Sequence, residues 1–160
     1  MTTTTGRRDR SPQAKRERIF AAASTLFAEL GFQGTTTQAV SDRADIAAGT
    51  LFRYAATKAE LLLMVYNTEL RQAITAGRLA AESVADPAAA VFAAVRPVLV
   101  GSHRNPDNAI HYQRELLFGV EANPHRAEGL ALVVELERVV SAILLRDIAE
   151  PAREQVELAA

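Results

Sequence analysis

The stretch GFQGTTTQAVSDRADIAAGTLFRYAATKAEL, residues 31–61, decides the fold of this chain. It predicts two short helices separated by a tight turn. Thr35 and Gln38 have the S/T-x-x-E/Q spacing of a capping box, in which each side chain satisfies an exposed amide at a helix start. The first short helix is therefore expected to begin there and to end near Ala44. Residues 45–47 are too few for anything but a turn.

A second short helix and a long one follow the turn. Residues 48–54 predict barely two turns of helix, and Thr57 with Glu60 repeats the capping-box spacing. We expect this second box to open a long helix over residues 58–82. Because helix nucleation is costly, two helices this short persist only when they pack against another element.

That element is predicted directly upstream. Between residues 19 and 30, apolar side chains recur at i, i+3, i+4 and i+7, the pattern of one buried helix face. Ser11 offers an N-cap, Gly31 offers a left-handed stop, and Phe32 is placed to fold back on the last turn. The spacing predicts a helix over residues 12–30. Three helices in this order are typical of a helix-turn-helix, whose second short helix can enter the major groove of DNA.

Residues 31–61 also resemble the head of the TetR family of bacterial transcriptional repressors, which reads approximately G-F/Y-x-x-T-T/S-V-x-x-I-A-x-x-A-G-V-S-x-G-T-L-Y-x-Y-F-x-S-K-E-E-L. The matches run in register without a gap: Gly31, Phe32, Thr35, Thr36, Val40, Ala44, Gly49, Thr50, Leu51, Tyr54, Lys58, Glu60 and Leu61. Asp45 stands at the usual turn glycine, Ala47 at a serine, Phe52 at a tyrosine and Ala55 at an aromatic residue. These departures predict a weaker or differently specified grip on DNA.

The resemblance implies a role for each matched position. The side chains implied to face base edges are those of Ala48, Gly49, Thr50, Phe52 and Arg53. The positions implied to hold phosphates are Thr35, Thr36, Tyr54 and Lys58. Arg53 is the only charged member of the base-facing set, and a guanidinium can bind guanine O6 and N7 in a bidentate way. Leu51 and Val40 are expected in the core.

Charge is distributed unevenly along the chain. The whole chain has a formal net charge of −1, but residues 1–60 carry nine basic and six acidic side chains. We expect residues 1–11 to form a flexible basic arm, 12–60 a DNA-binding domain, and 61–160 a helical regulatory domain for ligand binding and dimerisation. Residues 1–11 are equally compatible with a soluble tail that makes no contact with DNA.

The remainder of the chain is predicted to be helical, which makes the fold all-α, because no strand alternation or Asn-Gly turn occurs. The expected elements are a helix from Asp86-Pro87 that Pro97 kinks or ends, a loop over 101–106, a helix from Asp107, and a long helix from Asn123-Pro124 to near Glu150. The last helix is apolar on more than one side. It is therefore expected to contact more than its own core.

For ligand binding, the candidates are polar side chains around the predicted loop and the following helix: His103, His111, Tyr112 and Arg114. His111 and Glu115, four residues apart, could share a helix face as a metal pair or a ligand clamp. The alternative is that all of these are ordinary surface or satisfied polar residues. We predict no metal and no cofactor, and an apolar lining suggests a largely hydrophobic small-molecule effector.

The resemblance implies a homodimer, because half-sites about 34–36 Å apart need a two-fold protein. Members of the family are commonly longer, and their last two helices usually form the dimer bundle. Residues 151–160 leave room for about two turns. We therefore expect either an unusual dimer surface, such as the apolar long helix, or a shortened form with impaired dimerisation.

Taken together, these features predict a cytoplasmic, sequence-specific DNA-binding regulator, a repressor released from a palindromic operator by a small apolar ligand. An enzyme is not predicted, because the histidines are scattered and no nucleophile-base pair or phosphate-cradling glycine loop occurs. The chain has no cysteine and no apolar leader or membrane-length segment. The alternative is a helical interaction or adaptor protein, or a truncated regulator, with weak or no DNA binding.

Overall fold

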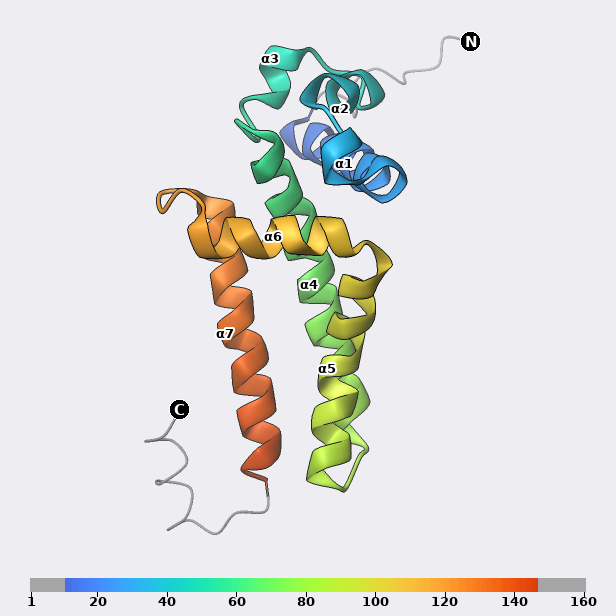
Figure 1. The fold of residues 1–160 in the computed structure, drawn as a ribbon, viewed down its shortest axis with the longest axis vertical. Helices are drawn as coiled ribbons and strands as arrows, with labels where there is room; N and C mark the ends of the chain where they lie inside the picture. Colours follow the sequence, from blue (N-terminus) through green and yellow to red (C-terminus); the bar gives the residue numbers. More distant parts are fainter. Residues whose placement is uncertain (1–10, 147–160) are drawn as a thin grey trace. The chain divides into compact units, whose positions relative to one another are not determined.

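The computed structural model of this chain describes residues 11–146, and every regular element in that range is a helix (Figure 1). The helices are α1 (Pro12–Gly34), α2 (Thr37–Arg43), α3 (Ala48–Leu51), α4 (Lys58–Glu82), α5 (Pro87–Arg104), α6 (Pro106–Phe118) and α7 (Pro124–Leu144). The prediction of an all-α fold is confirmed. No helix among the described residues is long and apolar enough to cross a membrane.

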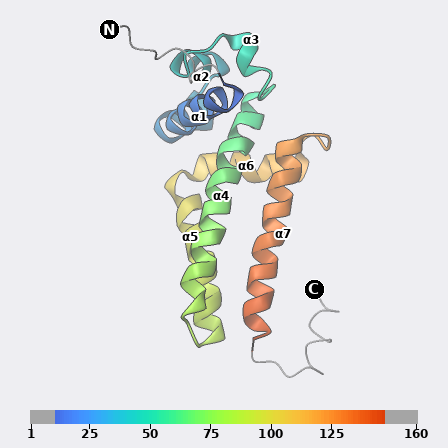
Figure 2. The same ribbon diagram turned by 180° about the vertical axis from the view of Figure 1, so that it is seen from behind.

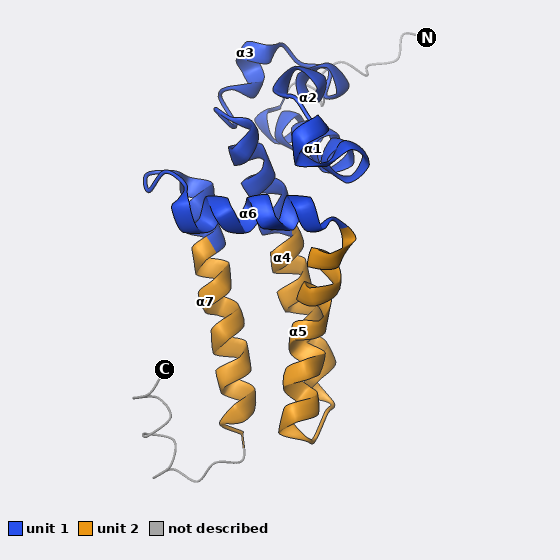
Figure 3. Cartoon of the chain, in the orientation of Figure 1, with its two compact units in different colours: residues 1–68, 105–129 blue, residues 69–104, 130–160 orange. Residues whose placement is uncertain are grey.

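The described chain forms two compact units, coloured separately in Figure 3. Unit 1 contains residues up to 68 together with 105–129, and unit 2 contains 69–104 together with the residues from 130 onward. Helices α4 and α7 each contribute to both units. Unit 1 is therefore larger than the segment 12–60, because α6 and the start of α7 belong to it.

Helix α1 begins as its sequence predicts. The Ser11 hydroxyl accepts a hydrogen bond from the Ala14 amide at 3.1 Å, and Pro12 occupies the first turn. Gly31 breaks the helix with φ 67° and ψ 179°, a left-handed conformation that favours glycine. The predicted stop is thus at the right residue, although helical structure resumes beyond it to Gly34.

The cap of α2 differs from the prediction by one residue. Thr36, not Thr35, is the N-cap, and its hydroxyl accepts from the Ala39 amide at 3.1 Å. Gln38 does not reach back, since its side chain donates to the Asp42 carboxylate at 2.7 Å. The capping box predicted for Thr35 and Gln38 is therefore wrong, while the predicted end of the helix near Ala44 is confirmed.

Helix α4 has the predicted bounds, Lys58–Glu82. The Thr57 hydroxyl accepts from the Glu60 amide at 3.1 Å, and the Glu60 carboxylate accepts from the Ala56 amide at 2.6 Å. Two exposed amides at the helix start are thereby satisfied. The reciprocal bond falls one residue earlier than in the usual capping box.

The predicted loop over residues 101–106 is wrong. Helix α5 passes through Pro97 and continues to Arg104, and α6 begins almost at once at Pro106 with Asn105 as its N-cap. Helix α7 opens as predicted, since Asn123 Oδ1 accepts from the two following amides at 2.8 and 3.2 Å. It ends at Leu144, before the predicted end near Glu150, which lies outside the described residues.

Unit 2 is a small helical core. In both Figure 1 and Figure 2, the later part of α4 runs beside α5. A Cβ built on Gly77 of α4 would lie 1.9 Å from the Ala94 carbonyl of α5, so only glycine allows these backbones to approach so closely. Ala81, Ala90, Ala94 and Ile143 form the buried cluster.

Helix α7 carries apolar residues on both its buried and its exposed sides. Leu132 and Ile143 are buried, whereas Val133 is 46% and Val134 is 42% exposed. The prediction that its apolar residues exceed one contact surface is confirmed within the described chain.

Candidate nucleic-acid interface

The turn between α2 and α3 has a left-handed residue at Asp45, with φ 51°. Aspartate tolerates this region better than most residues, since its short side chain can bond locally. Arg18 of α1 lies against the turn, with its Nη1 3.4 Å from the Asp45 carbonyl oxygen and 3.6 Å from Oδ2. The left-handed turn is therefore retained although Asp45 stands where the family pattern has a glycine.

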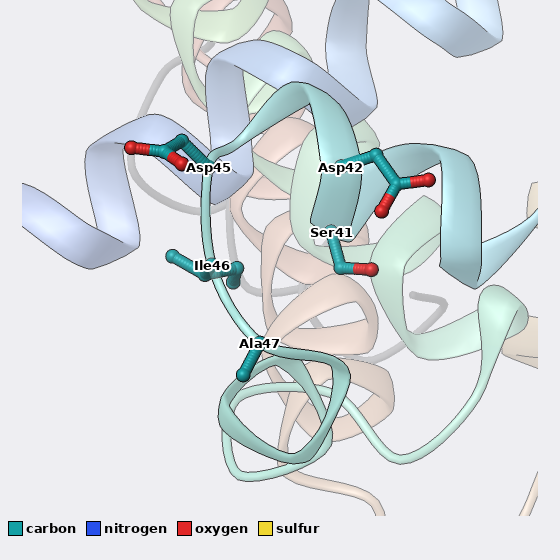
Figure 4. Close-up of a pocket in the computed structure, with 5 residues that line it drawn as sticks. All are labelled: Ser41, Asp42, Asp45, Ile46 and Ala47. Atoms are coloured by element: carbon teal, nitrogen blue, oxygen red, sulfur yellow. The ribbon is translucent and has the colours of Figure 1, made fainter.

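One side of this turn is an open depression of about 340 Å³, lined by Ser41, Asp42, Asp45, Ile46 and Ala47 (Figure 4). Asp42 comes from α2 and Asp45 from the turn itself. The carboxylates of Asp42 and Asp45 are both exposed, and their negative charges repel a phosphate group. The depression is thus a poor place for a nucleic-acid backbone.

Helix α3 is fixed by its buried residues. Leu51 is fully buried and Ala55 is 1% exposed, so one side of this segment packs into the core of unit 1. The backbone hydrogen bonds continue past the helix: the amides of Phe52 and Ala55 donate to the carbonyls of Ala48 and Leu51, both at 3.1 Å. Helical turns thus extend over most of the predicted range 48–54, although the regular helix ends at Leu51.

The opposite side of α3 faces solvent. Gly49, Phe52 and Arg53 are exposed, and their i, i+3 and i+4 spacing places them on one helix face. Phe52 is 51% exposed, so about half of its surface is open to solvent. Ala48 and Thr50 are half-buried beside this face. Of the base-facing set, then, Gly49, Phe52 and Arg53 form the accessible stripe.

Ala47 is the N-cap of α3, with φ −67° and ψ 143°, and makes no side-chain cap bond. An alanine at this position has no hydroxyl with which to cap the helix. The first amides of α3 therefore lack a side-chain acceptor at their own N-cap.

The structure corrects one phosphate-holding candidate. Thr35 is fully buried, and its hydroxyl donates to the Gly31 carbonyl at 2.8 Å. It therefore secures the break in α1 and cannot reach a phosphate. Thr36 is exposed, and its hydroxyl hydrogen is available because the oxygen acts only as an acceptor in the cap.

Tyr54 and Lys58 are already engaged within unit 1. The Tyr54 hydroxyl donates to the Pro12 carbonyl at 3.3 Å. Lys58 Nζ donates to the Phe32 carbonyl at 2.7 Å and lies 4.3 Å from the centroid of that phenyl ring. An ammonium group has three donors, so Lys58 keeps two for another acceptor, whereas Tyr54 must release Pro12 to donate elsewhere.

Sequence reasoning missed the contact that α6 makes with α1. Asn108, 1% exposed, donates from Nδ2 to the Phe27 carbonyl at 2.8 Å, and Asn105 donates to the same oxygen at 3.3 Å. His111 stacks on the Phe32 ring with centroids 4.2 Å apart. An asparagine before Pro106 signals a helix cap, but no local pattern shows that it reaches a residue so far away in the sequence.

The four ligand candidates are divided between the two units. His103 lies in unit 2, is exposed, and has its Nδ1 2.8 Å from the Leu99 carbonyl oxygen. Tyr112 lies in unit 1, is 7% exposed, and donates its hydroxyl to Asn67 at 2.8 Å. Arg114 is exposed on α6.

His111 does not pair with Glu115. Its Nε2 is 3.2 Å from Gln33 Nε2 and 3.6 Å from Asp107 Oδ1. Among the described residues, no group of three or more metal-ligating side chains occurs. A cavity of about 210 Å³ in unit 1, lined by residues that include Leu63 and Arg126, contains none of the four ligand candidates.

The comparison with protein families finds one match at this interface. The family described as "Bacterial regulatory proteins, tetR family" matches residues 19–65. This range holds α2, α3 and every residue of the base-facing and phosphate-holding sets.

Two curated repressors are similar to the chain. The HTH-type transcriptional repressor KstR of Mycobacterium tuberculosis is 26% identical over 147 residues, which are 91% of this chain and 64% of that protein. KstR of Rhodococcus jostii is 35% identical over 78 residues, which are 47% of this chain and 37% of that protein. This chain thus spans only part of the length of either repressor.

A solved structure is also similar over most of the chain. It is the TetR family transcriptional repressor FadR of Thermus thermophilus, crystallised with lauroyl-CoA. FadR is 30% identical, with a TM-score of 0.62 over 88% of this chain and 68% of FadR.

Proposed function

Since this chain belongs to the TetR family of bacterial regulatory proteins, we propose that it is a sequence-specific DNA-binding transcriptional regulator. It acts as a repressor that a small, largely apolar ligand releases from a palindromic operator. The observation that carries the proposal is the division of α3 into a buried side, Leu51 and Ala55, and an exposed stripe, Gly49, Phe52 and Arg53. Short helices are stable only through such packing, and the exposed side is then held ready for the major groove.

In this proposal the stripe faces base edges, with Ala48 and Thr50 at its side. The side chain of Arg53 makes no hydrogen bond or ion pair with the described residues, so its guanidinium is available to guanine O6 and N7. Thr36 and Lys58 hold phosphates through the donors that the fold leaves unused. The Tyr54 hydroxyl can also hold a phosphate if it gives up its hydrogen bond to the Pro12 carbonyl.

Three further features of the proposal rest on the family and on the named relatives. The regulator is a homodimer, because a palindromic operator needs two copies of the reading helix. It works in the cytoplasm by binding alone, without catalysis. Its effector is a small molecule with a large apolar part, in keeping with the lauroyl-CoA bound by FadR.

The test is sedimentation of the purified chain with and without genomic fragments, followed by sequencing of the retained DNA and titration of a retained duplex at increasing salt. A regulator should retain DNA fragments that share a sequence and should sediment as a dimer on them. Its affinity for the retained duplex should fall steeply as the salt concentration rises. Arg53→Ala should weaken binding to the retained duplex. Arg138→Ala, which removes one exposed positive charge from α7, is the control. An interaction or adaptor protein would retain no preferred sequence and would show no salt slope.

A further inference from the structure

Phe52 is an exposed aromatic residue on the solvent side of the α3 segment. It is 51% exposed, whereas its neighbour Leu51 is fully buried. Its amide donates to the Ala48 carbonyl at 3.1 Å, and its φ of −61° and ψ of −15° continue the helix. Because the backbone is held in helical geometry, the ring is held on the solvent side by the same packing that buries Leu51.

The surface beside the ring is open. Gly49 lies one turn earlier on the same face, and a Cβ built there would meet no atom within 4 Å. A glycine at this place lets a surface approach the phenyl ring without hindrance from the preceding turn. On the other side, Arg53 adds a positive charge next to the ring.

We propose that Phe52 reads the C5-methyl group of a thymine in each operator half-site. This inference rests on the proposed function. A phenyl ring has no hydrogen-bond donor or acceptor, so it cannot recognise the polar edges of bases. Among the groups in the major groove, only the thymine methyl is apolar. Contact with any other base would desolvate polar groups without replacing their hydrogen bonds.

The chemistry also separates Phe52 from Arg53. A tyrosine at this place would bring a hydroxyl able to bond to a phosphate or a base edge, and phenylalanine removes it. The stripe thus combines one apolar side chain, suited to a thymine methyl group, with one guanidinium, suited to a guanine.

The experiment uses a duplex retained from genomic fragments, in which each thymine is replaced in turn by deoxyuridine. This replacement deletes only the methyl group. At one position in each half-site, replacing thymine by deoxyuridine is expected to weaken binding by the native chain about fourfold. This is the factor that corresponds to one buried methyl-sized group. Phe52→Ala should bind the thymine duplex more weakly and show no further loss with deoxyuridine at that position, whereas Arg53→Ala should keep the loss.

The controls separate the possible failures. Phe52→Tyr keeps the ring and should keep the deoxyuridine effect, which guards against a folding defect in Phe52→Ala. If no deoxyuridine weakens binding, or if the loss is equal in the native chain and Phe52→Ala, the thymine reading is overturned while the proposed function stands. If the chain shows no sequence preference on any duplex, the proposed function fails and this inference fails with it.

Discussion

The side-chain amide of Asn108 donates a hydrogen bond of 2.8 Å to the backbone carbonyl of Phe27, which ties α6 to the last regular turn of α1 before its break. Asn108 is 1% exposed, so the bond is shielded from water. A buried carbonyl that loses its partner bears the cost of desolvation. The pairing therefore holds two elements of unit 1 that are far apart in sequence.

The Asn108→Ala variant should lower the free energy of unfolding by about 1–3 kcal/mol, the cost of leaving a buried acceptor short of a donor. Asn105 donates to the same oxygen from 3.3 Å and can limit the loss. Chemical denaturation followed by circular dichroism measures the change. Gln113→Ala, at an exposed position of the same helix, is the control and should stay within about 0.5 kcal/mol of the native chain. Equal effects of the two variants would contradict a structural role for the bond.

The Gly31→Ala variant should destabilise the chain by about 1–3 kcal/mol, because a Cβ is strained at φ 67° and ψ 179°. The space around Gly31 is not the reason, since the nearest atom to an added Cβ is 3.7 Å away. Gly101→Ala is the matched change inside α5, where an added Cβ meets nothing within 4 Å. It should raise stability by up to about 1 kcal/mol through helix propensity. Thermal unfolding of both variants should therefore show melting temperatures that move in opposite directions.

The start of α4 could be predicted from sequence because its signals are local. Thr57 and Glu60 satisfy amides within a few residues of themselves, so their spacing alone predicts where the helix begins. The predicted N-cap of α2 was wrong by one residue, because Thr35 and Thr36 carry the same side chain and the sequence alone does not distinguish them. Burial decides between them, and Thr35 is the one that the core encloses.

The region between α5 and α6 shows why other predictions failed. Pro97 and Gly101 are both helix-breaking residues, and together they predict an early end and a loop. The structure nevertheless continues the helix to Arg104. Asn105 and its contact with Phe27 depend on tertiary packing, which periodicity and spacing do not encode. The resemblance implied a base-facing set that contains the three residues of the exposed stripe on α3, but it did not separate them from Ala48 and Thr50, which packing leaves half-buried.

The Ala47→Ser variant should stabilise the chain by about 1 kcal/mol, because Ala47 already has the extended backbone of an N-cap and lacks only the hydroxyl. The matched opposite change is Thr36→Ala, which removes the 3.1 Å bond from the Ala39 amide and should cost a similar amount. Urea unfolding of the two variants and the native chain measures both changes. A neutral Ala47→Ser together with a destabilising Thr36→Ala would show that the first amides of α3 are already satisfied.

Arg53→Ala and Lys58→Ala should weaken DNA binding in different ways. Arg53 lies on the exposed stripe, so its loss should cost roughly 1–3 kcal/mol on a retained duplex and much less on a scrambled one. Lys58 is expected to hold a phosphate with the two donors that Phe32 leaves unused, so its loss should weaken binding to both duplexes and reduce the salt slope by about one.

Binding isotherms on both duplexes at several salt concentrations distinguish the two roles. Lys58→Met keeps the alkyl stem and removes the charge, and its unfolding curve corrects for the lost bond to the Phe32 carbonyl. Equal losses on the two duplexes for Arg53→Ala would exclude base reading. A salt slope unchanged in both Lys58 variants would show that this lysine serves the fold alone, since a released counterion is the signature of a phosphate contact.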